Sequence, residues 1–250
     1  MVSVLKRCDS REAVDSLYAE AATGCDSANR AWLIAVAHPR VPGALTRPAR
    51  EEAQEIFKEA AAITLTYSNR NGVHPPENVD HANPRPGLRR WIAPNTATSE
   101  LSRWREAWAA VHHEGSVTLA AAVGGHRKSA DDNFEGWEVE ARGIEAAVAD
   151  FAALVRANAV TLHYSEFEMR VGIEWTGDQA LRVLTINGHG HTYDGVSTPL
   201  SAYTPVRSTI NATASEGEFH QQVYELAQDC VNQGGITHLH LIAKPEPAED

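Results

Sequence analysis

One stretch in the middle of the chain constrains the fold more than any other: residues 104–125, which read WREAWAAVHHEGSVTLAAAVGG. In its second half, apolar side chains occupy every other position, at Val117, Leu119, Ala121 and Val123. A period of two residues is typical of a β-strand with one packed face. Gly115 can adopt the positive φ that a two-residue hairpin loop requires. The stretch therefore predicts two antiparallel strands that are joined at Glu114-Gly115.

Apolar residues at helical spacing predict four helices around this hairpin. The cleanest amphipathic pattern, with a period of 3.6 residues, runs from Ile144 to Val155. Ser215 and Glu218 have the spacing of a capping box, and the helix they begin is expected to end at Gly234-Gly235. Two earlier helices are expected to begin after Ser10 and after Thr46.

Four other segments have the composition of strands. Residues 31–37 form an unbroken apolar run, which suits a strand covered on both faces. Residues 169–186 predict a second hairpin that turns at Thr176-Gly177-Asp178, and residues 204–210 and 236–243 predict two more strands. The expected fold class is α+β, a mostly antiparallel sheet built from hairpins and covered by three or four helices.

Prolines and charges suggest how the chain is divided. We expect an N-terminal helical segment in residues 1–30, an α+β domain in residues 31–243 and a disordered acidic tail in residues 244–250. Five of the 12 prolines fall in the Pro/Asn-rich segment 68–98, and long irregular segments are often functional. A further boundary within this segment stays open.

Charge and cysteine usage narrow the class of protein. The formal net charge of −11 argues against direct binding to nucleic acid or to an anionic membrane, although a local basic patch could override it. The three cysteines are widely spaced, as in a reducing compartment. Because the sequence shows neither a secretory signal nor a long apolar run, we expect a cytoplasmic protein. Homo-oligomerisation is left open.

The most pointed group of potential metal ligands is His189, His191 and Asp194, directly after a predicted strand. Two imidazoles two residues apart can converge on one divalent metal ion with a carboxylate nearby. The His-x-His-x-Asp-His arrangement of metallo-β-lactamase-like hydrolases differs, because here the acid comes one residue later and no histidine follows it. The alternative interpretation is a polar loop tip, and no other cofactor is predicted.

Arg85, Arg89 and Arg90 beside Trp91 form the most basic spot in the chain. Arginines with a tryptophan can contact an anion or a nucleic acid, and the alternative is a solvated loop that the tryptophan anchors. The other polar candidates predict no joint site. The adjacent His112 and His113 should project to opposite faces of a strand. Four carboxylates are expected to be exposed charges on a hairpin: Glu166, Glu168, Glu174 and Asp178. The closing strand, 236–243, should place His238 and His240 on one face.

Four phrases in the chain carry a resemblance to a known family: Trp104–Gly125, Arg170–Trp175, Thr198–Val206 and Asp229–Ile236. From Ala31 onward the chain resembles the region that follows the AlbA/Schlafen-type DNA-binding domain in some actinobacterial proteins. That DNA-binding domain is not identifiable here, so no DNA-contacting residue is carried over. The resemblance implies an accessory or sensing module of a regulatory protein.

The sequence also lacks the common catalytic motifs, among them the phosphate-binding loop, the dinucleotide-binding glycines and the nucleophile elbow. We therefore expect a non-catalytic binding or regulatory module of unknown ligand, while enzymatic activity stays undecided. Two alternatives remain open at this point: a metal-dependent hydrolase that uses the His-x-His site, and a nucleic-acid-associated protein that uses the basic Pro-rich loop.

Overall fold

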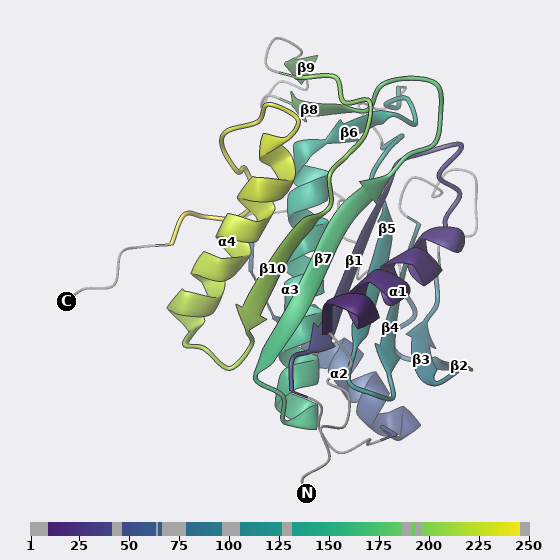
Figure 1. Ribbon diagram of the computed structural model, residues 1–250, viewed down its shortest axis with the longest axis vertical. Helices are drawn as coiled ribbons and strands as arrows, with labels where there is room; N and C mark the ends of the chain where they lie inside the picture. The colour runs from purple at the N-terminus through teal and green to yellow at the C-terminus, as the bar shows by residue number, and fades with distance from the viewer. Residues whose placement is uncertain are drawn as a thin grey trace, which may run out of the picture.

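The computed structural model describes residues 10–41, 47–63, 65–66, 79–96, 106–126, 132–186, 192–193 and 197–245. Seven antiparallel strands form its main sheet, in the order β10-β7-β1-β5-β4-β3-β2 (Figure 1). These strands are β1 (Trp32–Pro39), β2 (Arg85–Gly87), β3 (Arg90–Ala93), β4 (Ala107–His112), β5 (Val117–Ala122), β7 (Glu166–Glu174) and β10 (Val206–Asn211). A smaller sheet, with the order β6-β8-β9, lies at one end and consists of β6 (Glu138–Glu140), β8 (Arg182–Ile186) and β9 (Thr192–Tyr193).

Helices lie on both faces of the main sheet. In Figure 1, α1 (Ser10–Thr23) crosses in front of the strands, and α3 (Ala141–Leu162) runs behind them. The helices α2 (Arg50–Ala62) and α4 (Glu216–Asn232) pack against α3 on either side. The expected α+β class, with a mostly antiparallel sheet and covering helices, is confirmed. In the described part of the chain, no helix combines the length and apolar character that crossing a membrane would require.

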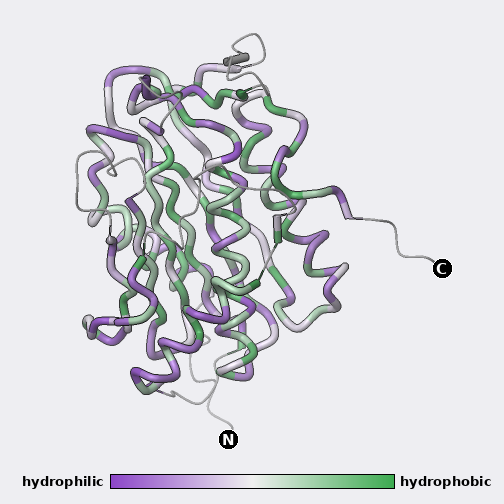
Figure 2. The backbone as a smooth tube through the Cα atoms, turned by 180° about the vertical axis from the view of Figure 1, so that it is seen from behind, coloured by the Kyte–Doolittle hydropathy of each residue, from purple (hydrophilic) through white to green (hydrophobic). Residues whose placement is uncertain are grey.

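The central strand β1 explains how the two layers pack. Ile34 and Val36 face α1, where they contact Val14 and Tyr18 in a small apolar cluster. Residues that alternate with them face the opposite side and join the large core beneath α3. Burial on both faces accounts for the unbroken apolar run in the sequence. Figure 2, which views the molecule from behind, shows that hydrophobic residues concentrate in the central strands and in α3.

The predicted hairpin at the centre of the chain is present as β4 and β5. Gly115 has a φ of +86°, and a Cβ atom at this position would lie 2.3 Å from the ring of Tyr164. The Asn158 side-chain amide of α3 donates a hydrogen bond of 2.8 Å to the Gly115 carbonyl. The turn therefore needs glycine for its backbone conformation and for the close approach of Tyr164.

Two local predictions are wrong. Residues 169–186 do not form a hairpin, because β7 pairs with β1 and β10 while β8 belongs to the smaller sheet. The indole of Trp175 donates to the Gln179 carbonyl, and this tight turn leads the chain away from the main sheet. Residues 236–243 do not form a strand either, so His238 and His240 share no strand face.

The segment expected to be the last strand is held by a buried carboxylate instead of a neighbouring strand. Glu145 of α3 is 0% exposed and accepts hydrogen bonds of 2.7–3.3 Å from the backbone N–H groups of His240, Leu241 and Ile242. Burial raises the pKa of Glu145, and these three hydrogen bonds oppose that shift. The carboxylate thus satisfies the N–H groups that a sheet would otherwise pair.

Candidate functional site

A row of polar side chains crosses the α1 face of the main sheet beside the first turn of α1. In strand pairing, Glu168 lies opposite Thr209 on one side and His38 on the other, and Arg90 lies opposite His112. The His112 backbone N–H donates to the Ser116 carbonyl, which places these two residues opposite one another as well. We call this set the histidine row: Thr209, Glu168, His38, Ser116, His112 and Arg90.

Members of the histidine row form hydrogen bonds with one another or with the next residue on the same face. Nδ1 of His38 lies 2.7 Å from Oγ of Ser116, which is 78 residues away in the sequence. Nε2 of His112 lies 3.0 Å from Oγ1 of Thr118, and the Thr209 hydroxyl donates a hydrogen bond of 3.4 Å to Glu168. Arg11 of α1 pairs with Glu168 from above, at 3.4 Å. Each side chain named here thus has at least one partner within the protein.

Burial keeps both histidines of the row uncharged at neutral pH. Desolvation, followed by the positive charge of Arg90, lowers the pKa of His112 to about 3. Desolvation also lowers the pKa of His38, although the nearby Glu114 carboxylate opposes this shift. The two histidines of the row are therefore neutral donors and acceptors held in fixed positions.

The pairing of His38 with Ser116 resembles a base beside a nucleophile, which is the arrangement that activates a hydroxyl. However, Ser116 is 0% exposed, so no substrate atom can reach its hydroxyl in this structure. Glu168, expected to be an exposed charge, is 6% exposed because it lies under Arg11. We assign the row to the architecture of the sheet.

A second polar group lies at the outer end of the sheet, around the hairpin of β2 and β3. Nε of Arg50 donates to the Pro84 carbonyl at 3.3 Å, and the Trp91 indole donates to the Pro48 carbonyl at 2.8 Å. These bonds hold the start of α2 against the hairpin. Four exposed arginines from the two segments form what we call the arginine cluster: Arg47, Arg50, Arg85 and Arg89.

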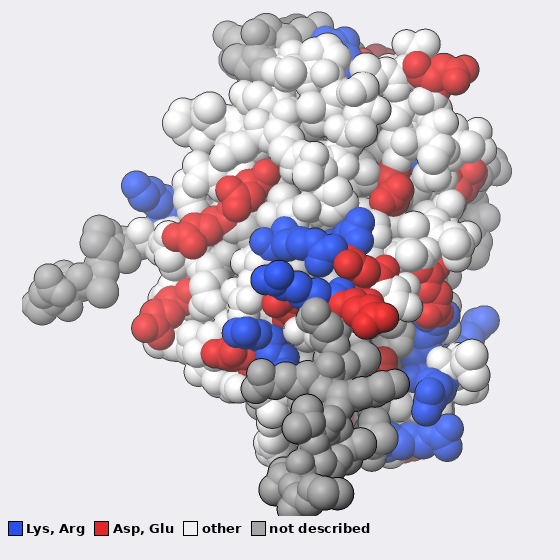
Figure 3. All heavy atoms as spheres, in the orientation of Figure 1, with Lys and Arg blue, Asp and Glu red and all other residues white. Residues whose placement is uncertain are grey.

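The turn between β4 and β5 adds a histidine to the arginine cluster. Nε of Arg47 donates to Nδ1 of His113 at 3.4 Å, and the His113 backbone N–H donates to the Arg89 carbonyl at 2.9 Å. Burial and the positive charges of Arg47 and Arg89 lower the pKa of His113, so its ring adds little positive charge of its own at neutral pH. Figure 3 shows Lys and Arg side chains gathered over the β2–β3 end of the molecule, at the lower right.

Several arginines elsewhere in the molecule have acidic partners, and those of the arginine cluster do not. Arg40 pairs with Glu166, and Arg170 and Arg207 both pair with Asp15. Within the described ranges, no carboxylate forms an ion pair with any arginine of the cluster. The acidic Glu52, in the first turn of α2, accepts a hydrogen bond from the Ala49 backbone N–H and so caps its own helix.

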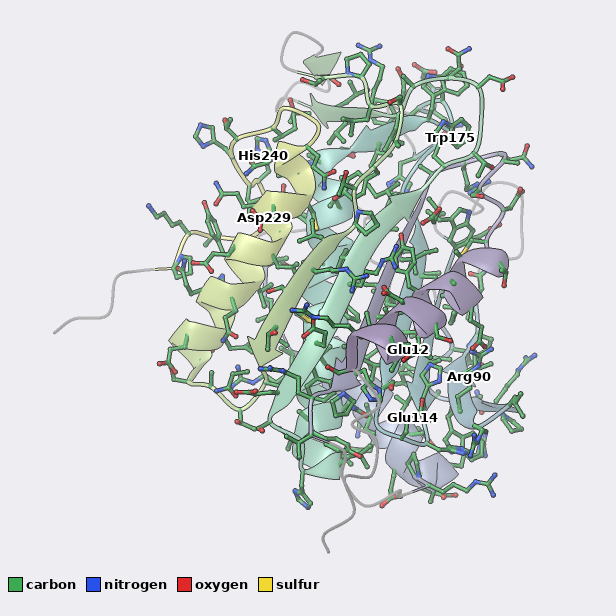
Figure 4. The ribbon with its side chains drawn as sticks, in the orientation of Figure 1. Glu12, Arg90, Glu114, Trp175, Asp229 and His240 are labelled. Carbon is green, nitrogen blue, oxygen red and sulfur yellow. The ribbon has the colours of Figure 1, made fainter. Side chains whose placement is uncertain are left out.

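Of the four residues expected to contact an anion, two are exposed and two are partly buried with partners inside the protein. Arg85 and Arg89 are exposed. Arg90 is 21% exposed and pairs with Glu20 of α1 at 2.6 Å, and the half-buried Trp91 packs against the core. Figure 4 shows Arg90 and Glu114 in the part of the molecule below α1. Sequence reasoning missed Arg47 and Arg50, because only the packing of α2 on the hairpin brings them there.

The predicted metal ligands His189, His191 and Asp194 lie outside the described residues. Among the residues that are described, no three His, Cys, Asp or Glu side chains are arranged to hold a metal ion. The metal site stays a prediction. Burial raises the pKa of the free thiols Cys25 and Cys230 to about 12, so both are protonated at neutral pH.

Comparisons of the chain with protein-family models, with curated proteins and with solved structures find no match. The resemblance to the region beside AlbA/Schlafen-type domains stays an expectation.

Proposed function

We propose that the chain is a non-catalytic binding or regulatory module that binds an anionic ligand through the arginine cluster. One observation carries this proposal: four exposed guanidinium groups gather without carboxylate partners among the described residues, in a chain whose net charge is −11. In such an acidic protein carboxylates are abundant, so a shortage of acidic residues does not explain why these arginines have no carboxylate partner. An arginine cluster without carboxylate partners is suited to bind negatively charged groups of another molecule.

The rigidity of the hairpin supports the proposal. Three hydrogen bonds fix the backbone of the hairpin: Trp91 to Pro48, Arg50 to Pro84 and His113 to Arg89. Guanidinium groups presented from a fixed backbone lose less conformational entropy on binding, which favours affinity. An accessory or sensing module of a cytoplasmic regulatory protein, as the resemblance implies, would use such a surface to recognise a charged partner.

Binding of a simple polyanion tests the proposal. Fluorescence anisotropy of labelled polyglutamate, titrated with protein at several salt concentrations, should show binding that weakens with salt. Replacing both Arg85 and Arg89 with Gln should weaken binding about 10-fold, since each guanidinium–carboxylate contact contributes roughly 0.7 kcal/mol at an exposed site. The matched control is Arg40→Gln, an exposed arginine that is paired with Glu166.

The control variant should bind polyglutamate as the wild type does. If the double variant binds equally well, or if binding does not change with salt, the arginine cluster is not the binding surface and the proposal is wrong.

A further inference from the structure

We infer that the partner is an acidic polypeptide segment that contains an apolar side chain, which Leu88 contacts while the arginine cluster binds the carboxylates. This inference rests on the proposed function and names the class of the partner. Leu88 lies at the tip of the β2–β3 hairpin and is 88% exposed, more than any other large hydrophobic residue in the described part of the chain. Arg85 and Arg89 flank it.

An exposed leucine between two arginines gives the tip two kinds of contact. Covering an apolar side chain with another apolar group is favourable in proportion to the area removed from water. The arginines can form paired hydrogen bonds with carboxylates on either side. A segment with acidic and apolar residues in alternation therefore satisfies both.

The backbone of Arg89 gives an independent indication that the tip has a role in recognition. Its φ is 56°, in the left-handed region that glycine or asparagine occupies with less strain. The side chain of Arg89 is exposed, and among the described residues it has no hydrogen bond or ion pair that would offset the strain. Strained residues of this kind concentrate at binding sites.

The shape of the hairpin indicates that side chains, and not an added strand, make the contact. Among the described strands, β2 is the last of the sheet and pairs with β3 alone. Its middle residue is Pro86, which has no backbone N–H to offer to a further strand. The available binding groups are thus the exposed side chains of the tip.

The same observations favour a polypeptide over a single-stranded nucleic acid. Proteins that bind single strands stack the bases on exposed aromatic rings. Trp91 is the only aromatic residue in residues 84–93, and its ring packs against the core while its indole N–H bonds to Pro48. A long polyanion would also be repelled by the net charge of −11.

Three labelled probes of equal length test the inference: a peptide of glutamates separated by leucines, one of glutamates separated by serines, and an oligothymidylate. We expect the leucine peptide to bind about 5-fold more tightly than the serine peptide, which corresponds to partial burial of one leucine. Leu88→Ser should abolish that difference and leave the serine peptide unaffected. The matched control is Val160→Ser, which changes an exposed apolar residue of α3 that is 64% exposed.

The two proposals fail in different ways. If Leu88→Ser leaves the preference for the leucine peptide unchanged, or if oligothymidylate binds more tightly than that peptide, the inference is wrong, although binding through the arginines can still hold. If replacing both Arg85 and Arg89 with Gln changes the binding of none of the probes, the proposed function itself is wrong.

Discussion

The histidine row and the arginine cluster are neighbouring polar groups that have opposite surroundings. Three members of the histidine row are buried (Glu168, Ser116 and His112), its histidines are uncharged, and hydrogen bonds join its side chains across strands. The arginine cluster is exposed and charged, and no carboxylate of the described residues pairs with it. A polar group that has internal partners contributes to the fold, whereas one without them is available to another molecule. The following predictions test this division.

The largest change in the free energy of unfolding should come from protonation of the histidine row in acid. The unfolded chain binds a proton at His112 below its ordinary pKa of 6.5, but the folded chain does so only near pH 3. The contribution of His112 is therefore fully present above pH 6.5 and is lost as the pH falls toward 3. At pH 5 the free energy of unfolding should be about 2 kcal/mol lower for this reason. Urea unfolding at pH 7 and pH 5 measures it.

The control for the titration is His112→Asn, which retains a polar side chain but does not ionise. This variant should lose less stability between pH 7 and pH 5 than the wild type. An equal loss in both proteins would show that His112 is not the neutral buried group that the structure describes.

A smaller effect is expected when the cross-strand pair of the row is broken. Ser116→Ala removes the hydrogen-bond partner of His38 and should lower the free energy of unfolding by about 1.5 kcal/mol. Combining it with His38→Leu should cost less than the sum of the two single changes, because neither polar group is then left alone. Chemical denaturation of the four proteins measures the coupling, and additive losses would contradict it.

In the arginine cluster the expected change in stability has the opposite sign. Arg89→Gly should raise the free energy of unfolding by about 1 kcal/mol, since glycine adopts a φ of 56° without strain. The same variant should bind polyglutamate less well. Arg85→Gly is the matched control, because Arg85 lies within β2 and glycine weakens a strand. Thermal unfolding of both variants shows whether their stability changes in opposite directions.

The smallest change in the free energy of unfolding should follow the removal of an arginine that has no carboxylate partner. Arg85→Gln should change the free energy of unfolding by less than about 0.5 kcal/mol. Arg90→Gln should cost more, because it breaks the ion pair with Glu20 at a site that is only 21% exposed. If Arg85→Gln proves to be the more destabilising change, Arg85 contributes to the fold and the division between the two groups fails.

The parts of the fold that depend on residues close together in the sequence could be predicted from it. The turn at Gly115 and the Ser215–Glu218 cap of α4 are local, because glycine freedom and side-chain capping act over a few residues. The partners of β7 could not be predicted, because its pairing with β1 depends on residues more than a hundred positions away. Periodicity assigns a strand but not its neighbours.

The same limit applies to the sites. Sequence analysis identified Arg85 and Arg89 from their local density, but it missed Arg47 and Arg50, which the packing of α2 brings to the hairpin. The histidine row was missed as a group, because its members come from five strands and the turn before β5, and no two of them are adjacent in the sequence. Only the register of the sheet aligns them.

The buried carboxylate of Glu145 has a consequence for any shortened form of the protein. A chain cut before His240 would lose the three backbone donors of Glu145 and leave its buried carboxyl group without these hydrogen bonds. Removing the residues from His240 onward would thus destabilise the packing around α3 as well as the C-terminal segment. Fusion partners and affinity tags at the C-terminus should therefore leave residues 240–242 intact.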